Sequence, residues 1–158
     1  MSKLLESLAK GAEDCTFPPQ LRTLESYEMD TAGGELPARF FEQCGQRLET
    51  LGLGKLGLAG SLPGAVGQLK EVKSIILHGN KLSGELPAEL GECKKLRMLL
   101  LFGHDFSGQL PEELGHCSKL RDLRIKPGNR DLANGQEHLF EQSVTSKGQE
   151  TLVRRERR

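Results

Sequence analysis

The sequence predicts an α/β solenoid, a stack of short, similar turns in which each turn adds one strand to a parallel sheet. Three consecutive 24-residue segments, 48–71, 72–95 and 96–119, carry leucine, glycine and proline at matching positions. The chain has 19 glycines, no tryptophan and only 4% aromatic residues, so its core must consist of thin aliphatic layers. Self-similarity at a fixed period of about 20–50 residues is typical of stacked architectures.

The segment before the full repeats is expected to close the open end of the stack. Residues 1–20 place three leucines on one helical face and then a Pro-Pro pair, which predicts a capping helix followed by a stop. Residues 21–47 keep an L-x-x-L opening and the turn residues Gly34 and Pro37, but this segment exceeds 24 residues. We therefore expect a divergent first repeat over 21–47.

Residues 48–119 form the three full repeats. Each opens with L-x-x-L-x-L, whose final alternation predicts a short strand with inward leucines. A glycine followed by Leu-Pro then predicts a sharp bend, because glycine permits positive φ and proline fixes its own φ. The residues after each proline are expected to turn back through a short 3₁₀ segment. The structural residues of the bends are Gly60, Gly84, Gly108, Pro63, Pro87 and Pro111.

The regular pattern fades towards the C-terminus. A fourth unit starts at Leu120 and loses its register at Pro127, so we expect a partial last repeat and a C-terminal cap over 120–142. Residues 143–158 are mostly polar, with five basic and two acidic side chains. Such a composition predicts a flexible basic tail.

The repeat resembles the plant-type class of the leucine-rich-repeat family, whose unit reads LxxLxLxxNxLxGxIPxxLGxLxx. The resemblance implies a short right-handed solenoid with a parallel sheet on its concave face and 3₁₀ or loop returns. It also implies a role in recognition or scaffolding. In the family, an asparagine column bonds the backbone of adjoining turns. Only Asn80 keeps that place here; Leu56 and His104 replace it and Asn129 comes one residue late, so we expect a weaker ladder.

Composition narrows the classes of partner and location. Lysine plus arginine equals aspartate plus glutamate at 22 each, so no overall charge argues for nucleic acid or a membrane surface. No apolar run approaches the ~20 residues of a membrane span. The first residues lack a signal-peptide pattern, so we expect a cytoplasmic protein with reduced thiols. Cys93 and Cys117 share a column with Leu69, which predicts buried hydrophobes rather than a disulfide.

The sequence predicts neither an enzyme nor a metal or cofactor site. The four histidines, His78, His104, His116 and His138, fall on different parts of the repeat and do not converge. A thiol or histidine enzyme remains an alternative that would require a convergent cleft.

The outward side chains of the strands are the candidate binding site. Stacking places equivalent positions side by side, so Ile76, Leu100 and Phe102 are expected to form an apolar patch with a basic border. We expect a protein or peptide of acidic or amphipathic character to bind this concave face and its loop edges, with Phe102 and Arg97 as anchors. The full set of candidate contacts is Lys73, Ile76, His78, Arg97, Leu100, Phe102, Arg121, Arg124 and Lys126.

The size of this face limits the prediction. About five strands give a concave sheet of only about 400 Å², whereas a standard interface takes ~800 Å² from each partner. Either the loop edges contribute, or binding is weak, or the chain is part of a longer array. The main alternative is accordingly a fragment of a receptor-like protein, such as the repeat region of a receptor kinase or of an inhibitor.

Overall fold

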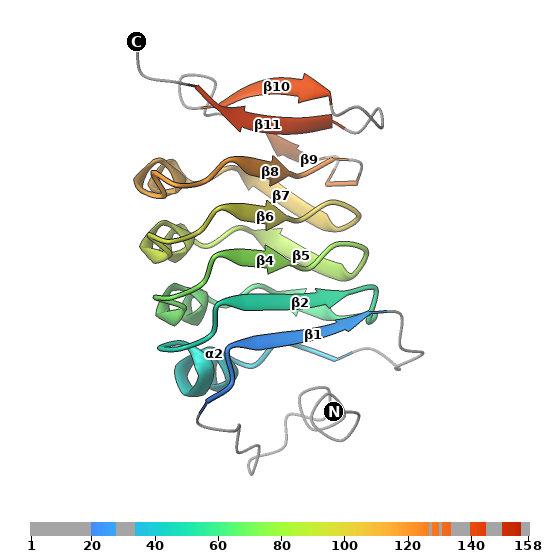
Figure 1. Cartoon of the computed structure of the whole chain (residues 1–158). Coiled ribbons are helices and arrows are strands. Elements are labelled where there is room, and N and C mark those ends of the chain that lie inside the picture. The colour runs from blue at the N-terminus through green and yellow to red at the C-terminus, as the bar shows by residue number, and fades with distance from the viewer. Residues whose placement is uncertain are drawn as a thin grey trace.

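The chain forms a stack of turns with two sheets on opposite sides (Figure 1). The computed structural model describes residues 20–27, 34–126, 128–129, 131–133, 140–144 and 150–155. The predicted solenoid with a parallel sheet and 3₁₀ returns is confirmed. The capping helix expected over residues 1–20 falls on residues outside the described ranges, apart from Gln20.

One sheet has seven strands. Its first five strands run parallel and in register, one from each successive turn, so that Leu51, Ile75, Leu99 and Leu123 lie side by side. The last two strands pair antiparallel at the C-terminal end. In spatial order the strands are β1 (Thr23–Tyr27), β2 (Thr50–Gly54), β4 (Ser74–Ile76), β6 (Met98–Leu100), β8 (Asp122–Arg124), β11 (Glu150–Arg154) and β10 (Phe140–Val144).

A second parallel sheet, which the sequence analysis places in loops, lies behind the first. It forms because the residues leading into each bend also alternate: Lys81 and Ser83 are exposed while Leu82 is fully buried. Its strands are β3 (Ala59–Ser61), β5 (Lys81–Glu85), β7 (Asp105–Gln109) and β9 (Asp131–Ala133).

The returns between the two sheets are helical. Three of them are 3₁₀ helices, and each begins directly after the proline of its bend. Gly60, Gly84 and Gly108 have φ of +77° to +79°, a left-handed conformation that glycine adopts without strain. The first turn instead has an α-helix. The helices are α2 (Ala38–Cys44), η1 (Gly64–Gln68), η2 (Ala88–Glu92) and η3 (Glu112–His116).

Buried polar side chains satisfy the backbone between the turns. Asn80 makes four hydrogen bonds: its Oδ1 accepts from the N–H groups of Leu56 (2.8 Å) and Leu58 (3.1 Å), and its Nδ2 donates to the carbonyls of Leu53 (2.7 Å) and Leu77 (2.6 Å). This accounts for both the donors and the acceptors of one amide. The tight curve therefore leaves none of these groups unpaired.

The ladder is more complete than predicted. His104 takes the same role as asparagine, because its Nε2 donates to the Leu77 carbonyl (2.8 Å) and its Nδ1 accepts from the Leu82 N–H (3.2 Å). Asn129 bonds Phe106, Leu101 and Ile125. Its late position is absorbed by positive φ at Gly128 (92°) and at Asn129 itself (45°).

The C-terminal segment closes the stack. The prediction of a flexible tail from residue 143 is wrong for residues 143–144 and 150–154, which belong to β10 and β11. Phe140 and Leu152 are only 1% and 4% exposed, because they cover the core of the last turn. The Arg154 guanidinium also donates to the carbonyls of Gly115 (2.9 Å) and Cys117 (3.1 Å).

Candidate functional site

The concave face is built from the third, fifth and seventh positions of each repeat. The strands begin at the third position, as in Thr50 and Met98, so strand alternation sends these three positions to the same side. The sequence analysis instead assigned the second position, which includes Lys73, to this face. That position precedes the strand and lies at its entry, so the predicted basic border is displaced to one side.

A pair of stacked rings lies at the C-terminal end of these strands. The centroids of His78 and Phe102 are 4.9 Å apart and their planes are inclined by 22°. The imidazole also covers Gly54, where an added Cβ would lie 2.7 Å from the ring. Burial, together with the charge of Lys55, holds the pKa of His78 below its usual value. The ring is therefore predominantly neutral near pH 7 and acts as an aromatic surface.

Aliphatic side chains continue this surface across two turns. Ile76 and Leu100 are register partners on β4 and β6, and both are half-buried. Met98 occupies the third position of β6 and is also half-buried. The sequence analysis missed it, although the alternation of L-x-x-L-x-L would have placed it beside Leu100. We define the apolar patch as Ile76, His78, Met98, Leu100 and Phe102.

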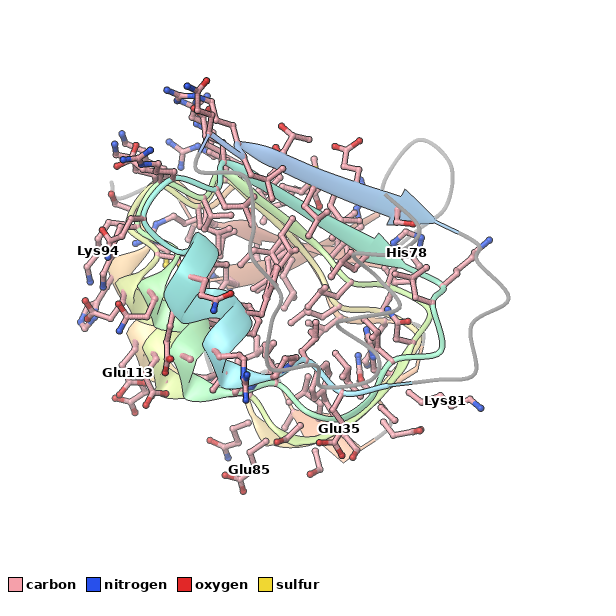
Figure 2. The ribbon with its side chains drawn as sticks, turned by 90° about the horizontal axis from the view of Figure 1, so that it is seen from below. Glu35, His78, Lys81, Glu85, Lys94 and Glu113 are labelled. Atoms are coloured by element: carbon pink, nitrogen blue, oxygen red, sulfur yellow. The ribbon has the colours of Figure 1, made fainter. Side chains whose placement is uncertain are left out.

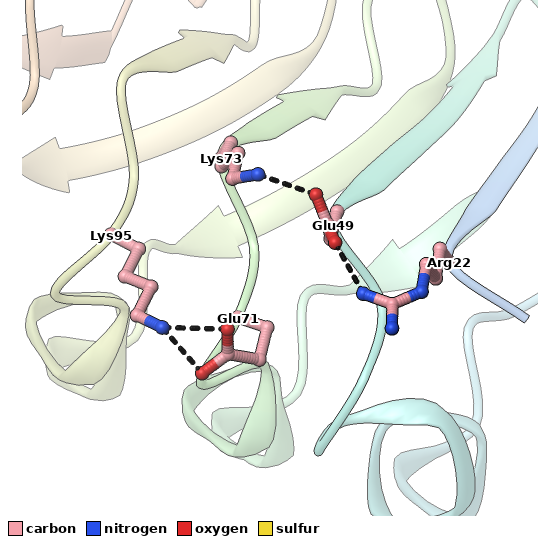
Figure 3. Close-up of polar contacts among 5 residues, drawn as sticks. All are labelled: Arg22, Glu49, Glu71, Lys73 and Lys95. Atoms are coloured by element: carbon pink, nitrogen blue, oxygen red, sulfur yellow. Dashed lines mark hydrogen bonds and ion pairs between the residues drawn. The ribbon is translucent and has the colours of Figure 1, made fainter. Parts of the chain in front are cut away.

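Several of the expected basic contacts are already paired within the molecule. The Glu49 carboxylate accepts from Arg22 (2.7 Å) and from Lys73 (2.5 Å), as Figure 3 shows. Arg124 forms two hydrogen bonds of 2.9 Å with Asp122. These ion pairs link neighbouring side chains of the sheet, so Lys73 and Arg124 are less available to a partner than the sequence suggests.

Other predicted contacts remain exposed. Arg97 and Arg121 are exposed at the strand entries, and Lys126 is exposed just after β8. In the parts of the chain that the structure describes, none of these three side chains has a carboxylate partner. The structure thus separates the patch from its border: apolar groups lie on the strands, and free cations lie at their ends.

Among the residues that the structure describes, the thiols of Cys93 and Cys117 lie apart from the histidine side chains of the concave face. The Cys93 and Cys117 thiols are free and fully buried, and each donates to a backbone carbonyl, of Val66 and Leu90 respectively. Burial raises their pKa to about 12 and about 11, so the nucleophilic thiolate is scarce. Within the described ranges, no three His, Cys, Asp or Glu side chains are grouped to hold a metal ion. No helix there is long and apolar enough to cross a membrane.

Comparisons with known proteins agree with this geometry. The family model described as Leucine Rich Repeat matches residues 71–93. The plant peptide hormone receptor RGFR1, solved in complex with RGF2, is 33% identical and superimposes with a TM-score of 0.65. That match covers 73% of this chain and 17% of the receptor. This chain is a plant-type leucine-rich-repeat protein.

Two shorter leucine-rich-repeat structures also resemble this chain. The ectodomain of the receptor kinase SOBIR1 from Arabidopsis thaliana is 30% identical over 72% of this chain and 59% of that one, with a TM-score of 0.64. The BIR3–SERK2 complex from Arabidopsis thaliana gives 31% identity, with coverage of 70% and 57% and a TM-score of 0.62. The chain thus spans less than two thirds of each of these structures. A search of curated proteins finds no significant match.

These structures overturn one prediction. The absence of a signal-peptide pattern suggests a cytoplasmic protein, but the similar structures are ectodomains of membrane receptors, which lie outside the cell. The prediction failed because it rested on the lack of a signal-peptide pattern and of an apolar membrane span in the given sequence, and neither is a property of the repeats themselves.

Proposed function

We propose that this leucine-rich-repeat protein is a non-catalytic recognition module that binds a protein or peptide on its concave face. The observation that carries the proposal is the apolar patch, in which an aromatic pair and aliphatic side chains form one continuous surface on rigid strands. Interaction surfaces are enriched in aromatic residues, methionine and arginine. The apolar patch and the arginines at its edge have this composition. A similar structure supports the proposal, since RGFR1 is solved with RGF2.

The partner is expected to be amphipathic, with acidic groups beside its apolar anchor. An apolar side chain would lie against Leu100 and Phe102. Carboxylates would then reach Arg97 and Arg121, whose guanidinium groups can bind them in bidentate fashion. Lys126 supplies a further cation at the other end of the strands.

The size of the sheet favours a receptor-like assembly. Across its seven strands the sheet face spans about five residue positions in each turn, which gives about 550 Å². This area is still below the ~800 Å² that each partner contributes to a standard interface. We infer that the module acts as part of a larger extracellular receptor-like protein or with a second binding subunit. The buried Cys93 and Cys117 thiols suit such an oxidising environment, because burial suppresses their thiolate form.

Selection of binders from a library of random linear peptides tests the proposal. Leu100→Asp and Phe102→Asp should each weaken the selected peptides by about tenfold or more, since central apolar anchors carry much of the binding energy. Ser83→Asp introduces the same charge on exposed β5 of the other sheet and should leave binding unchanged. If folded Leu100→Asp and Phe102→Asp variants bind as tightly as Ser83→Asp, the concave face is not the site.

A further inference from the structure

A second surface of the molecule carries a concentrated positive charge. We define the basic edge as residues 20–22, 45–49, 68–73, 92–97 and 116–121, where each turn passes from its return into its strand. It holds nine lysines and arginines against three glutamates, although the whole chain has net charge +0. Figure 2 shows nitrogen-tipped side chains gathered where the strands begin, near Lys94, whereas Glu35 and Glu85 lie on the opposite side.

The charges of the basic edge form an ordered row. Each backbone N–H at the strand entry donates to the carbonyl of the equivalent residue in the preceding turn, at 2.6 to 2.9 Å. The spacing along this row is therefore that of neighbouring strands, about 4.8 Å. The residues linked in this way are Arg22, Glu49, Lys73, Arg97 and Arg121.

The two halves of the row differ in whether their cations are paired with carboxylates. In the N-terminal half, Glu49 lies between Arg22 and Lys73 and pairs with both. In the C-terminal half, Arg97 and Arg121 are direct neighbours, and Lys119 lies beside them. Among the residues that the structure describes, these three have no carboxylate partner. Adjacent like charges destabilise a fold, so fold stability does not explain why these three cations lie side by side. Binding of an external anion would explain it.

A polar cavity that is half open to solvent lies at the N-terminal end of the same edge. It has a volume of about 570 Å³ and is lined by Gln20, Arg22, Gln46, Arg47 and Glu71. The Glu71 carboxylate is held by Lys95, at 2.7 and 2.6 Å (Figure 3). Amide and carboxylate groups bond hydroxyls, while the guanidinium groups bond anions. The cavity thus fits one hydroxyl-rich, negatively charged unit, and its volume is in the range of small-ligand sites.

We infer that the basic edge binds a linear acidic polysaccharide, whose carboxylate or sulfate groups lie along the row and one of whose sugar units enters the cavity. This surface differs from the apolar patch, although Arg97 and Arg121 border both. The edge offers no exposed apolar anchor, because the apolar residues within it are buried, as Leu96 and Leu120 are, or packed half-buried against the core, as Leu21 is. A protein partner normally needs such an anchor. It also presents no Phe, Tyr or Trp side chain on which nucleic-acid bases could stack, and the single imidazole of His116 is its one exposed ring.

Peptide geometry fits the row less well than a polymer with an anion on every unit. An extended peptide presents side chains on one face every ~6.7 Å, because successive residues alternate. Lys73, Arg97 and Arg121 follow one another at about 4.8 Å, so acidic side chains along such a peptide would lose register within two turns. A flexible polysaccharide can match each cation in sequence.

The test measures binding of the purified chain to four polymers at low salt: polygalacturonate, heparin, neutral dextran and poly-glutamate. Polygalacturonate carries carboxylates alone, whereas heparin carries sulfates as well as carboxylates. Tighter binding of heparin at equal charge concentration would therefore identify sulfate as the preferred anion. At least one should bind more tightly than poly-glutamate at equal charge concentration, and dextran should not bind. Equal or tighter binding of poly-glutamate would overturn the assignment to a polysaccharide.

Matched variants locate the site. Lys119→Gln with Arg121→Gln should weaken polysaccharide binding by about tenfold or more, whereas Arg39→Gln with Lys81→Gln removes the same charge elsewhere and should not. Equal weakening by both pairs would mean non-specific attraction and refute the proposal. Lys119→Gln alone serves if the double variant fails to fold.

The cavity and the concave face require separate variants. Gln46→Ala changes no charge, so it should weaken the polysaccharide but not poly-glutamate; equal effects on both would refute the placement of a sugar unit in the cavity. Phe102→Asp should retain polysaccharide binding while losing the peptides selected on the concave face. Loss of both ligands in a folded Phe102→Asp variant would show that the two surfaces are not separate.

Discussion

Replacing His104 should change how the stability of the stack depends on pH. The imidazole is 3% exposed, and its Nδ1 must be unprotonated to accept from the Leu82 N–H. Burial, the largest cause, lowers the pKa of His104 to about 4, against an ordinary value of 6.5. Between these values the unfolded chain binds a proton that the folded chain does not. Stability is therefore lost as the pH falls from about 6.5 towards 4.

The size of this loss follows from the difference in pKa. Each pKa unit corresponds to about 1.4 kcal/mol, so the shift of His104 corresponds to about 3 kcal/mol as an upper limit. In His104→Asn the side chain offers the same donor and acceptor without a titrating group in this range. The variant should consequently lose most of the acid sensitivity between pH 6.5 and 4 while keeping its stability near pH 7.

Urea unfolding followed by far-UV circular dichroism at several pH values measures the effect. His116→Asn is the matched control, because His116 is exposed and forms no rung of the ladder. His78 also has a lowered pKa and contributes in the same direction, so His78→Asn separates its share. If His104→Asn shows the same fall in unfolding free energy as the wild type, His104 is not the titrating group and the assignment of its hydrogen bonds is wrong.

Three further predictions concern stability and hydrogen exchange. Asn80→Ala should lower the free energy of unfolding in urea by about 2–4 kcal/mol, because it leaves buried backbone N–H and C=O groups without hydrogen-bond partners. A loss as small as that of Ser83→Ala would contradict the stabilising role of Asn80. Gly84→Ala should cost about 1–2 kcal/mol, because its φ is +79°. Thr151→Val removes a hydroxyl 3.0 Å from Asp122 Oδ1, so hydrogen exchange should accelerate in β10 and β11 but not in β4. Unchanged exchange there would show that this hydroxyl does not hold the hairpin.

The leucine columns could be predicted from the sequence because burial repeats with the period. Leu51, Ile75 and Leu99 recur every 24 residues, and each is fully buried. The residue at which each strand begins could not be predicted in this way. The leucine spacing fixes which residues point inward, but not at which residue the backbone becomes extended, so Met98 was missed and Lys73 was assigned to the wrong surface.

The polar ladder and the C-terminal hairpin show two further limits of prediction from the sequence. An asparagine pattern does not reveal that the imidazole of His104 provides one donor and one acceptor in the same geometry. Nor does a 24-residue period reveal β11, whose pairing with β8 is antiparallel and joins Leu152 to Leu123. The ion pair of Arg124 with Asp122, two residues apart on β8, was not predicted either, because the sequence analysis gave Asp122 no role.

The parallel register of both sheets makes the repeat a unit that can be duplicated. A second copy of residues 72–95 inserted after Lys95 would continue the pairings of β4 with β6 and of β5 with β7 without new turn chemistry. Each added copy would widen the concave face by about 80 Å², so about three would bring it to the size of a standard interface. Insertion after Arg124 would instead separate β8 from the antiparallel hairpin. The molecule can therefore be lengthened from within, while its hairpin stays in place as a fixed end piece.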